Sequence, residues 1–424
     1  MKINKKIAVI GIGRVGLPLA LVFANEGFRV YGIGRSPEKI SLLKNAKMPF
    51  VEQNADNLLK KHVNKNFLPT TEYNKISECD YIILTLGTPI DENMNPVFDQ
   101  ITDALKSASP YFKKGQTLIL RSTVSPRTTE YVQSFLNSIA GIKIGKDFFI
   151  AFCPERIAEG YSIEETKTIP QIIGGIDRSS SKKAEELFKS IGVKTLITDA
   201  VSAELAKLFT NMYRYINFAI ANEFMLISDN YHRDIYEIVN LVNHNYKRGG
   251  LKLPGLTGGP CLFKDGFFLI SDIPFTDLIS TSWKINESIP LMLVKRVRER
   301  IKLEGKKVAI LGLAFKSEID DIRESLSFKV RKAMLREGAN VFLHDPYVKN
   351  YVNQKIEKDV YTAIEKADVL FIAVNHKEYR SLDVDKIKKL VNKNCIVCDV
   401  WNVFKTDKIV FTINQLANNG KIKR

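Results

Sequence analysis

The stretch IAVIGIGRVGLPLALVF, residues 7–23, decides the fold. Its first four residues are typical of a buried strand, and Gly11, Gly13 and Gly16 follow at GxGxxG spacing before an apolar helix. Such glycines permit a tight turn and close approach of a pyrophosphate, and the helix N-terminus supplies amide donors. A strand–GxGxxG–helix–strand order predicts dinucleotide binding, whereas the bland alternative is a glycine-rich turn without a ligand. The expected contacts are Gly11, Ile12, Gly13, Arg14, Val15 and Gly16.

Strand-like runs alternate with helix-period segments through the first ~200 residues, which predicts a parallel, doubly wound sheet. Helical periodicity then extends from Ser202 to about Arg300, and alternation returns from Lys306. We therefore predict an α/β protein with two Rossmann-like doubly wound domains, joined by a helical core with a long spine helix starting near Ser202. The predicted domains are residues 1–200, 201–300 and 301–424. The predicted strands of the first are Ile7–Ile10, Arg29–Ile33, Tyr81–Leu86, Thr117–Leu120, Phe148–Phe152 and Lys194–Ile197.

Composition narrows the class of protein. The 424 residues suffice for two or three domains, and no run approaches the ~20 apolar residues of a membrane span. The net charge of +16 comes from dispersed lysines without an aromatic-interleaved basic block, which favours anionic ligands in clefts over nucleic acid or a membrane surface. The start, MKINKKIAVIGIG, runs directly into folded sequence, so we do not expect a cleaved signal.

The five cysteines are few, odd in number and scattered, which favours a reducing cytoplasm over a disulfide framework. Cys395 and Cys398 have CxxC spacing, but their segment NCIVCDVW reads as a strand. No second Cys/His pair completes a zinc site, so we predict no metal. Cys261 differs from the others because it lies in GLTGGPCLFKDG, residues 255–266, between glycines and a Lys-Asp pair. This setting suggests a nucleophile.

One expected part of the nucleotide site is missing. A carboxylate normally ends the second strand and binds the adenosine ribose, but RVYGIGRS places Gly34 there, followed by Arg35 and Ser36. A guanidinium and a hydroxyl could receive a 2′-phosphate, which would favour NADP. Alternatively Arg35 stacks on adenine and NAD binds.

The segment SAELAKLFTNMYR places Glu204, Lys207 and Asn211 on one helical face, among apolar neighbours that suggest a largely buried helix. Glu204 and Lys207 could form a salt bridge, or Lys207 and Asn211 could hold a developing oxyanion. A hydride-accepting cofactor and a thiol together allow two oxidations, because a thiolate can attack the aldehyde and pass through a thioester to an acid. The water of the last step needs a base, either Asp265 or Glu155, near Thr123; Lys264 could also lower the thiol pKa.

Several motifs together resemble the UDP-glucose/GDP-mannose dehydrogenase family nearly end to end. They are GIGRVGLPLA, LGTP, STVSPRTTE, CPERIAEG, SAELAKLFTNMYRYINFAIANE, PGLTGGPCLFKD, GLAFKSEIDDIRES and HDPY. The resemblance implies an N-terminal Rossmann domain that binds NAD, a helical dimerising core, and a C-terminal α/β domain that binds the sugar nucleotide. CPER with GGPCLFKD is more similar to the UDP-N-acetylhexosamine branch, which acts on the mannosamine or glucosamine sugar, than to the UDP-glucose branch.

The resemblance also implies residue roles. The catalytic set is Cys261, Lys207, Asn211, Asp265, Glu155 and Thr123. Cofactor contacts beyond the glycine motif are Arg35, Thr88, Pro89 and Thr123. The substrate ligands are Glu155, Arg156, Glu159, Lys207, Asn211, Gly258, Lys316 and Arg323, with Arg248 reaching the substrate of the partner subunit.

Some positions depart from the family pattern. Arg121 stands where many members carry an acid, and Arg127 replaces the usual glycine before Thr128. The second α/β region begins KKVAILGLAFK without GxGxxG, so it is a poor site for a second dinucleotide. Lys316 and Arg323 beyond its first strand suit a diphosphate, although Arg323 and Asp321 could simply be ion-paired.

The sequence thus predicts NAD(P)-dependent, four-electron oxidation of the C6 hydroxymethyl group of a UDP-sugar to a uronate, by a cytoplasmic homodimer or larger homo-oligomer, for polysaccharide or glycan synthesis. UDP-glucose is the alternative substrate. A one-step hydroxyacid dehydrogenase and a non-catalytic nucleotide-binding protein are the further alternatives; the first would not require Cys261.

Overall fold

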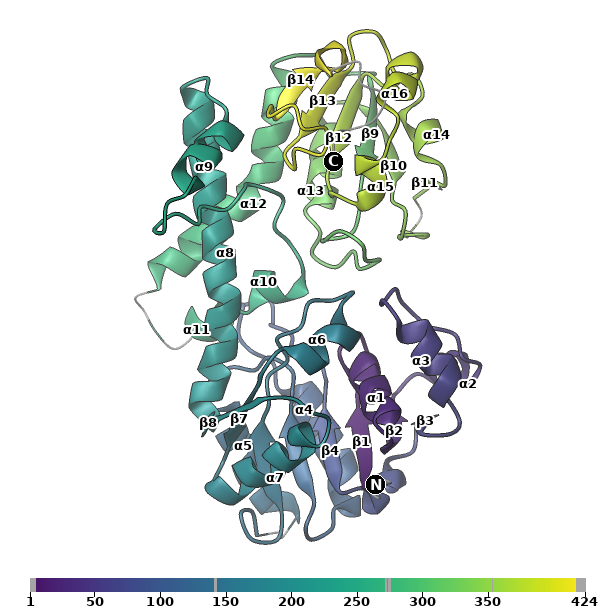
Figure 1. The fold of residues 1–424 in the computed structure, drawn as a ribbon, viewed down its shortest axis with the longest axis vertical. Helices are drawn as coiled ribbons and strands as arrows, with labels where there is room; N and C mark the ends of the chain where they lie inside the picture. The colour runs from purple at the N-terminus through teal and green to yellow at the C-terminus, as the bar shows by residue number, and fades with distance from the viewer. Residues whose placement is uncertain (1–4, 141–142, 271–272, 274–275, 353, 417–424) are drawn as a thin grey trace. The chain divides into compact units, whose positions relative to one another are not determined.

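A computed structural model describes residues 5–140, 143–270, 273, 276–352 and 354–416. Residues 1–4, which belong to the N-terminal segment for which we expected no cleaved signal, lie outside the described residues. The chain divides into two compact units (Figure 1). The first comprises Met1–Thr210 and Lys264–Pro274, and the second comprises Asn211–Phe263 and Phe275–Arg424. No helix of the described residues is long and apolar enough to cross a bilayer.

The first unit contains an eight-stranded sheet in the order β3-β2-β1-β4-β5-β6-β7-β8. All neighbouring strands are parallel except β6 and β7. Each predicted strand is confirmed to within two residues at either end, and β3 and β7 were not predicted. The strands are β1 Lys6–Ile10, β2 Arg29–Ile33, β3 Phe67–Thr70, β4 Tyr81–Leu84, β5 Thr117–Leu120, β6 Phe149–Phe152, β7 Gln171–Gly175 and β8 Thr195–Asp199.

Helices cover both faces of this sheet, which explains why its strands are apolar throughout rather than alternating. Ile7 and Val9 of β1 join the core under α1, α3 and α6, while Ala8 and Ile10 join the core under α4 and α5. The helices are α1 Gly16–Asn25, α2 Pro37–Lys44, α3 Ala55–His62, α4 Asp99–Ala108, α5 Thr128–Ala140, α6 Ser162–Thr168, α7 Arg178–Lys189 and α11 Phe267–Ile270, with 3₁₀ turns η1 Tyr73–Glu78 and η2 Ser109–Tyr111.

The second unit contains a six-stranded sheet in the order β11-β10-β9-β12-β13-β14, in which β14 is antiparallel to β13. The predicted return of strand–helix alternation after Lys306 is confirmed. Its strands are β9 Lys307–Leu311, β10 Asn340–His344, β11 Ile356–Glu357, β12 Val369–Ile372, β13 Ile396–Asp399 and β14 Val410–Thr412. Its α/β helices are α13 Ser327–Arg336, α14 Val360–Ile364, α15 Lys377–Arg380 and α16 Val384–Leu390, with η3 Ile413–Gln415.

The predicted spine helix is α8, Ala200–Asn230, which starts two residues before Ser202 and is teal in Figure 1. Our expectation that it is largely buried is wrong for one face: Phe209 is 57% exposed and Tyr213 is 71% exposed. Leu208 and Met212, one turn apart on another face, are buried. Apolar residues of α8 therefore lie both on a buried face and on an exposed face, and the sequence does not distinguish the two. The remaining helices are α9 Ile235–Asn243, α10 Pro260–Lys264 and α12 Asp277–Arg298.

Candidate active site

A cavity of about 330 Å³ lies at the carboxyl ends of β1, β2 and β4. It is at the point where the strand order of the first sheet reverses, which is where open α/β sheets bind ligands. Of the predicted cofactor contacts, Gly11, Ile12, Gly13 and Arg35 line it; Arg14, Val15, Gly16, Thr88, Pro89 and Thr123 do not. Sequence reasoning missed the lining residues on other elements: Lys39, Tyr73, Leu86, Gln100, Asp103 and Ser107.

The three motif glycines have different reasons to be glycine. Gly11 has φ +98°, and a Cβ there would lie 2.8 Å from the Thr85 carbonyl oxygen. A Cβ on Gly16 would lie 2.1 Å from the Gly11 carbonyl oxygen, so packing of α1 excludes it. A Cβ on Gly13 would have no heavy atom within 4 Å. Protein packing therefore does not demand Gly13, but close approach of a pyrophosphate does, and the turn fits a dinucleotide.

The missing carboxylate also has a packing explanation. A Cβ on Gly34 would lie 3.0 Å from Ile12 Cγ1, so a larger residue would require Ile12 to shift. Ser36 caps α2: its hydroxyl accepts a hydrogen bond from the Lys39 amide at 3.2 Å and donates to the Glu38 carboxylate at 2.7 Å. One of the two groups predicted to receive a 2′-phosphate thus already contacts an anion. This arrangement favours NAD.

Side chains of the CPER turn, residues 153–160, form hydrogen bonds with backbone groups within the turn and beyond it. Glu155 accepts a hydrogen bond from the Ile157 amide, and the Arg156 guanidinium donates to the Pro170 carbonyl oxygen. Glu159 pairs with Arg14 at 2.6 Å, which brings a predicted substrate ligand against a predicted cofactor ligand.

Glu52, which sequence reasoning missed, anchors the far end of the same turn. Its buried carboxylate accepts hydrogen bonds from the amides of Gly160 at 3.0 Å and Ser162 at 2.7 Å. The contact joins residues more than a hundred positions apart, so no local pattern announced it.

Arg121 stabilises the start of the CPER turn through hydrogen bonds. Its guanidinium donates to the Cys153 carbonyl oxygen at 3.2 Å and to Gln171 Oε1 at 2.8 Å, and Gln171 donates to the Pro154 carbonyl oxygen at 3.0 Å. Burial lowers the pKa of Arg121, and the charge of Glu155 opposes that shift. The departure from the family pattern at position 121 therefore supports the turn that carries Glu155.

A chain of polar contacts connects two predicted catalytic residues, Asp265 and Thr123, with Thr88, a predicted cofactor contact, and with Lys264. The Lys264 ammonium lies 2.9 Å from the Asp265 carboxylate and 3.3 Å from the Thr88 hydroxyl. Thr88 in turn donates to the Thr123 carbonyl oxygen at 2.6 Å. Asp265 is fully buried. The structure thus brings Asp265, Thr88 and Thr123 together through Lys264.

Lys207 and Asn211 are buried on the same face of α8, at 6% and 5% exposed. Among the described residues, Lys207 forms no salt bridge with Glu204; the expected alternative of an ion pair is therefore wrong. Glu204 instead caps α5, accepting hydrogen bonds from the Arg127 amide at 2.6 Å and the Thr129 amide at 2.8 Å. Burial raises the pKa of the Glu204 carboxyl, and these hydrogen bonds oppose the shift.

The predicted nucleophile is set apart from the other thiols by exposure. Cys261 is exposed at the start of α10, whereas the other four cysteines are buried. Burial raises the pKa of Cys79, Cys153 and Cys395 to about 12 and raises that of Cys398 still further. Cys398 lies in β13 and Cys395 directly precedes it, which confirms the strand predicted for this segment. Thiolate chemistry therefore favours Cys261.

In the second unit, Asp345 fills the turn that follows β9. Its Oδ2 accepts hydrogen bonds from the amides of Leu313 at 2.6 Å and Ala314 at 3.1 Å. His376 Nδ1 accepts from the Glu318 amide at 3.0 Å, so His376 Nε2 carries the proton that faces Asp345 Oδ2 at 3.2 Å. The amides that would cradle a pyrophosphate are thus occupied, in agreement with the absence of GxGxxG.

Lys316 and Arg323 lie in the remainder of this turn. The predicted ion pair is present, since Arg323 Nε lies 3.0 Å from both carboxylate oxygens of Asp321. The Arg323 side chain nevertheless remains 59% exposed. The ion pair orients the guanidinium without burying it.

Comparison with known proteins identifies the architecture. Models of the UDP-glucose/GDP-mannose dehydrogenase family match its NAD binding domain at residues 5–192, its central domain at 201–288 and its UDP binding domain at 309–406. The chain belongs to the UDP-glucose/GDP-mannose dehydrogenase family. It is accordingly an NAD-dependent nucleotide-sugar dehydrogenase, an oxidoreductase whose substrate is a UDP-sugar.

Relatives of this dehydrogenase span almost its full length. The UDP-N-acetyl-D-mannosamine dehydrogenase of Methanocaldococcus jannaschii is 31% identical, over 96% of this chain and 94% of its own. That of Campylobacter jejuni is 32% identical, over 90% of this chain and 98% of its own. The solved structure of UDP-D-ManNAc dehydrogenase from Pyrococcus horikoshii has a TM-score of 0.85 at 30% identity, covering 91% of this chain and 93% of its own.

Proposed function

We propose that this dehydrogenase oxidises the C6 hydroxymethyl group of a UDP-N-acetylhexosamine, UDP-N-acetylmannosamine or UDP-N-acetylglucosamine, to the uronate. The exposure of Cys261 carries the proposal, because the acid-forming route needs a thiol that substrate can reach. The names of the archaeal and Campylobacter relatives support the choice of sugar. We assign cofactor binding to residues 1–200, the helical core to 201–300 and the UDP-sugar site to 301–424.

The reaction proceeds by two oxidations at one carbon. The C6 alcohol first loses a hydride and a proton to give the aldehyde. The Cys261 sulfur then bonds to the aldehyde carbon, loss of a second hydride leaves a thioester, and water breaks the carbon–sulfur bond to release the uronate and the thiol. NAD, when bound, supplies the hydride acceptor for both oxidations.

Buried polar groups suit the charges that this route develops. Lys207 and Asn211 present an ammonium and an amide from one buried face of α8, as an oxyanion requires. Asp265 or Glu155 serves as the base for the hydrolytic water. The hydrogen-bonded connection from Asp265 through Lys264 and Thr88 to Thr123 supports a role for Asp265.

We assign the substrate ligands as the sequence predicts. Arg156, Glu159 and Gly258 line the sugar, while Lys316 and Arg323 bind the diphosphate. Arg156 and Glu159 are held by Pro170 and Arg14, so they present a fixed surface.

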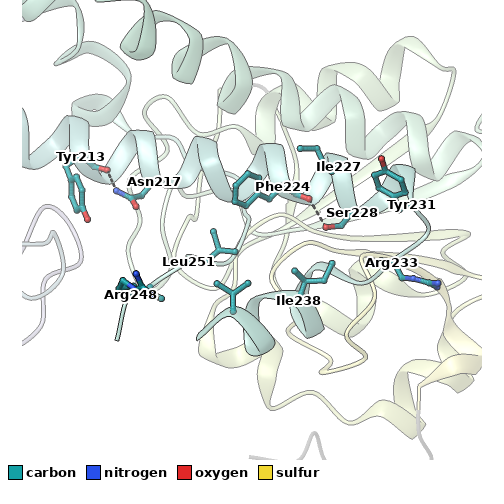
Figure 2. A pocket seen from close by; sticks show the side chains of 13 residues that line it. Tyr213, Asn217, Phe224, Ile227, Ser228, Tyr231, Arg233, Ile238, Arg248 and Leu251 are labelled. Carbon is teal, nitrogen blue, oxygen red and sulfur yellow. Dashed lines mark hydrogen bonds between the residues drawn. The ribbon is translucent and has the colours of Figure 1, made fainter. Parts of the chain in front are cut away.

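We further propose that two copies pair through the helical core. The exposed face of α8 and the nearby α9 border a cavity of about 670 Å³, whose lining includes Phe224, Ile227 and Leu251 (Figure 2). Uncovered apolar surface of this kind marks interaction sites. Arg248 lies on the same cavity, which suits its predicted reach into the site of a partner subunit. We place the dimer in the cytoplasm, where unpaired thiols persist.

UDP-glucose is the alternative substrate, since the UDP-glucose dehydrogenase of Pyrobaculum islandicum has a TM-score of 0.84 at 25% identity. A panel of UDP-sugars against NAD and NADP, read by absorbance of reduced nicotinamide, decides between them. We expect turnover with a UDP-N-acetylhexosamine and NAD. Turnover with UDP-glucose alone, or preference for NADP, would overturn the corresponding assignment. Binding of nucleotides or nucleic acid without turnover of any sugar would favour the non-catalytic alternative.

Cys261→Ser separates the acid-forming route from a one-step dehydrogenase. We expect acid release to fall at least ~10³-fold, because the serine hydroxyl is not ionised near pH 7, with unchanged UDP binding. Full activity in the variant, with one reduced cofactor per substrate, would favour the one-step alternative.

A further inference from the structure

The glycine loop that leads to Cys261 is pressed against the turn that follows β9. The Gly259 amide donates to the Glu324 carbonyl oxygen at 3.0 Å. A Cβ on Gly259, whose φ is +104°, would lie 2.6 Å from the Phe315 ring, and one on Gly258 would lie 2.4 Å from the Glu324 carbonyl oxygen. The loop therefore follows the surface of this turn without room for any side chain between them.

The start of the loop is also fixed. The Gly255 amide donates to Asn222 Oδ1 at 2.9 Å, and a Cβ on Gly255 would lie 2.4 Å from the Trp401 ring. Trp401 is itself held by a hydrogen bond from its indole nitrogen to the Ala373 carbonyl oxygen at 2.9 Å. The beginning of the loop is therefore anchored by Asn222 and Trp401, and its end rests on Phe315 and Glu324.

These two contact residues are the chain neighbours of the two cations assigned to the diphosphate. Phe315 directly precedes Lys316, and Glu324 directly follows Arg323. The turn is closed on itself, because the Phe315 amide donates to the Asp321 carbonyl oxygen at 2.9 Å. A displacement of Lys316 or Arg323 would therefore also displace Phe315 or Glu324, which contact the cysteine loop.

We propose that Phe315 and Glu324 are positioning residues that couple occupancy of the nucleotide site to the position of the Cys261 thiol. The inference deepens the proposed function and rests on it, since it requires a uridine diphosphate at Lys316 and Arg323. Nucleotide binding fixes the conformation of the turn, and the turn fixes the positions of Gly258 and Gly259. The loop then fixes the position of the Cys261 thiol, three residues after Gly258. An exposed thiol thus reaches its working position only with substrate in place.

The test measures the alkylation rate of Cys261 by iodoacetamide, with and without saturating UDP, in the full-length protein. The other four thiols are buried, so peptide mapping resolves Cys261 cleanly. UDP lacks the hexose and leaves the sugar end of the site open to the reagent. Calorimetry on the same samples measures UDP affinity.

In the wild type we expect UDP to change the alkylation rate at least ~3-fold, and in Phe315→Ala we expect UDP to bind but leave the rate unchanged. Phe315→Tyr, which keeps the ring edge facing Gly259, should restore the coupling. Phe315→Ala should also lower kcat about tenfold with little change in KM, because a displaced nucleophile costs rate rather than binding.

Each other outcome has a definite meaning. If UDP binds and changes alkylation equally in wild type and Phe315→Ala, UDP merely shields the thiol and the coupling is wrong. If UDP binds the wild type without changing alkylation, the coupling is wrong although the proposed function stands. If UDP does not bind the wild type, the proposed function fails and the coupling with it.

Hydrogen exchange of residues 253–263 in the wild type needs no substitution and covers the case of a variant that does not fold. We expect UDP to slow exchange in this segment. Unchanged exchange with UDP bound would overturn the coupling.

Discussion

The turns after β1 and β9 begin alike and then diverge. Gly11 has φ +98° and Gly312 has φ +99°, and each amide donates to the last residue of the neighbouring strand, at 2.9 and 2.8 Å. Beyond that point the first turn leaves Gly13 open on one side, whereas the second has its amides taken by Asp345. The first turn thus leaves its donors open to a cofactor, whereas the amides of the second turn are already bound by the protein's own carboxylate. In the proposed function, the diphosphate of the substrate is therefore bound by side-chain cations.

The largest effect should come from removing the internal carboxylate. The Asp345 carboxylate accepts from the Leu313 and Ala314 amides and faces His376 with one oxygen, and it accepts from the Tyr347 and Val348 amides with the other. Asp345→Asn turns one of the two oxygens into an NH2 donor, so one of these groups loses its acceptor, and we expect a loss of about 3 kcal/mol in the free energy of unfolding. Denaturant unfolding followed by circular dichroism measures it. We expect no gain of NAD binding to the second unit, and a stable variant with a second NAD site would break the comparison.

The first turn should respond differently at two of its glycines. Gly13→Val should weaken NAD binding at least ~10-fold with little change in melting temperature, because its side chain points into the space a pyrophosphate needs. Gly16→Ala is the matched control: its Cβ would meet the Gly11 carbonyl oxygen at 2.1 Å, so we expect about 1–3 kcal/mol of destabilisation. Equal loss of stability in both variants, measured by thermal unfolding with NAD titration, would contradict the distinction.

Acid should weaken the second turn selectively. Burial by itself raises the pKa of the Asp345 carboxyl, but the hydrogen bond from His376 and hydrogen bonds from backbone amides outweigh it, so its pKa lies below the usual value. A lowered pKa in the folded state contributes stability that is present above the unfolded pKa of about 3.9 and is lost as the pH falls through the folded pKa. Unfolding free energies measured from pH 6 downward should therefore fall less steeply in Asp345→Asn than in the wild type. Parallel pH profiles would count against this role for Asp345.

The smallest effect should come from Arg127, which has φ +66° in the turn capped by Glu204. Arg127→Gly removes the strain of a left-handed side-chain residue but increases the entropy of the unfolded chain, so we expect the unfolding free energy to change by less than about 1 kcal/mol. A loss above 2 kcal/mol would show that the arginine side chain itself holds the turn.

Short sequence patterns predicted the core strands and the long helix of the fold. Apolar runs of four or more residues identified the core strands, and helical periodicity identified α8, because these patterns are set within a few residues. GxGxxG placed the cofactor turn, and the glycines and Lys-Asp pair singled out Cys261 among the cysteines. Family motifs implied Asp265, Thr88 and Thr123 as site residues, and these three are linked in the structure through Lys264.

Long-range partners were not predictable in this way. Glu204 sits at helical spacing from Lys207, yet it caps a helix 75 residues earlier in the chain. Asp345 and Glu52 likewise serve amides more than 30 positions away. A carboxylate selects among all amides that the fold brings near it, and no spacing in the sequence encodes that choice. The exposed face of α8 was missed for a related reason, since exposed apolar residues at helical spacing cannot be told from core residues in the sequence.

The most direct measurement is the number of reduced cofactors formed per UDP-sugar consumed, with the product analysed by mass spectrometry. The four-electron account predicts two NADH and one uronate for each UDP-N-acetylhexosamine. One NADH per sugar, with an aldehyde or ketone as the final product, would contradict it.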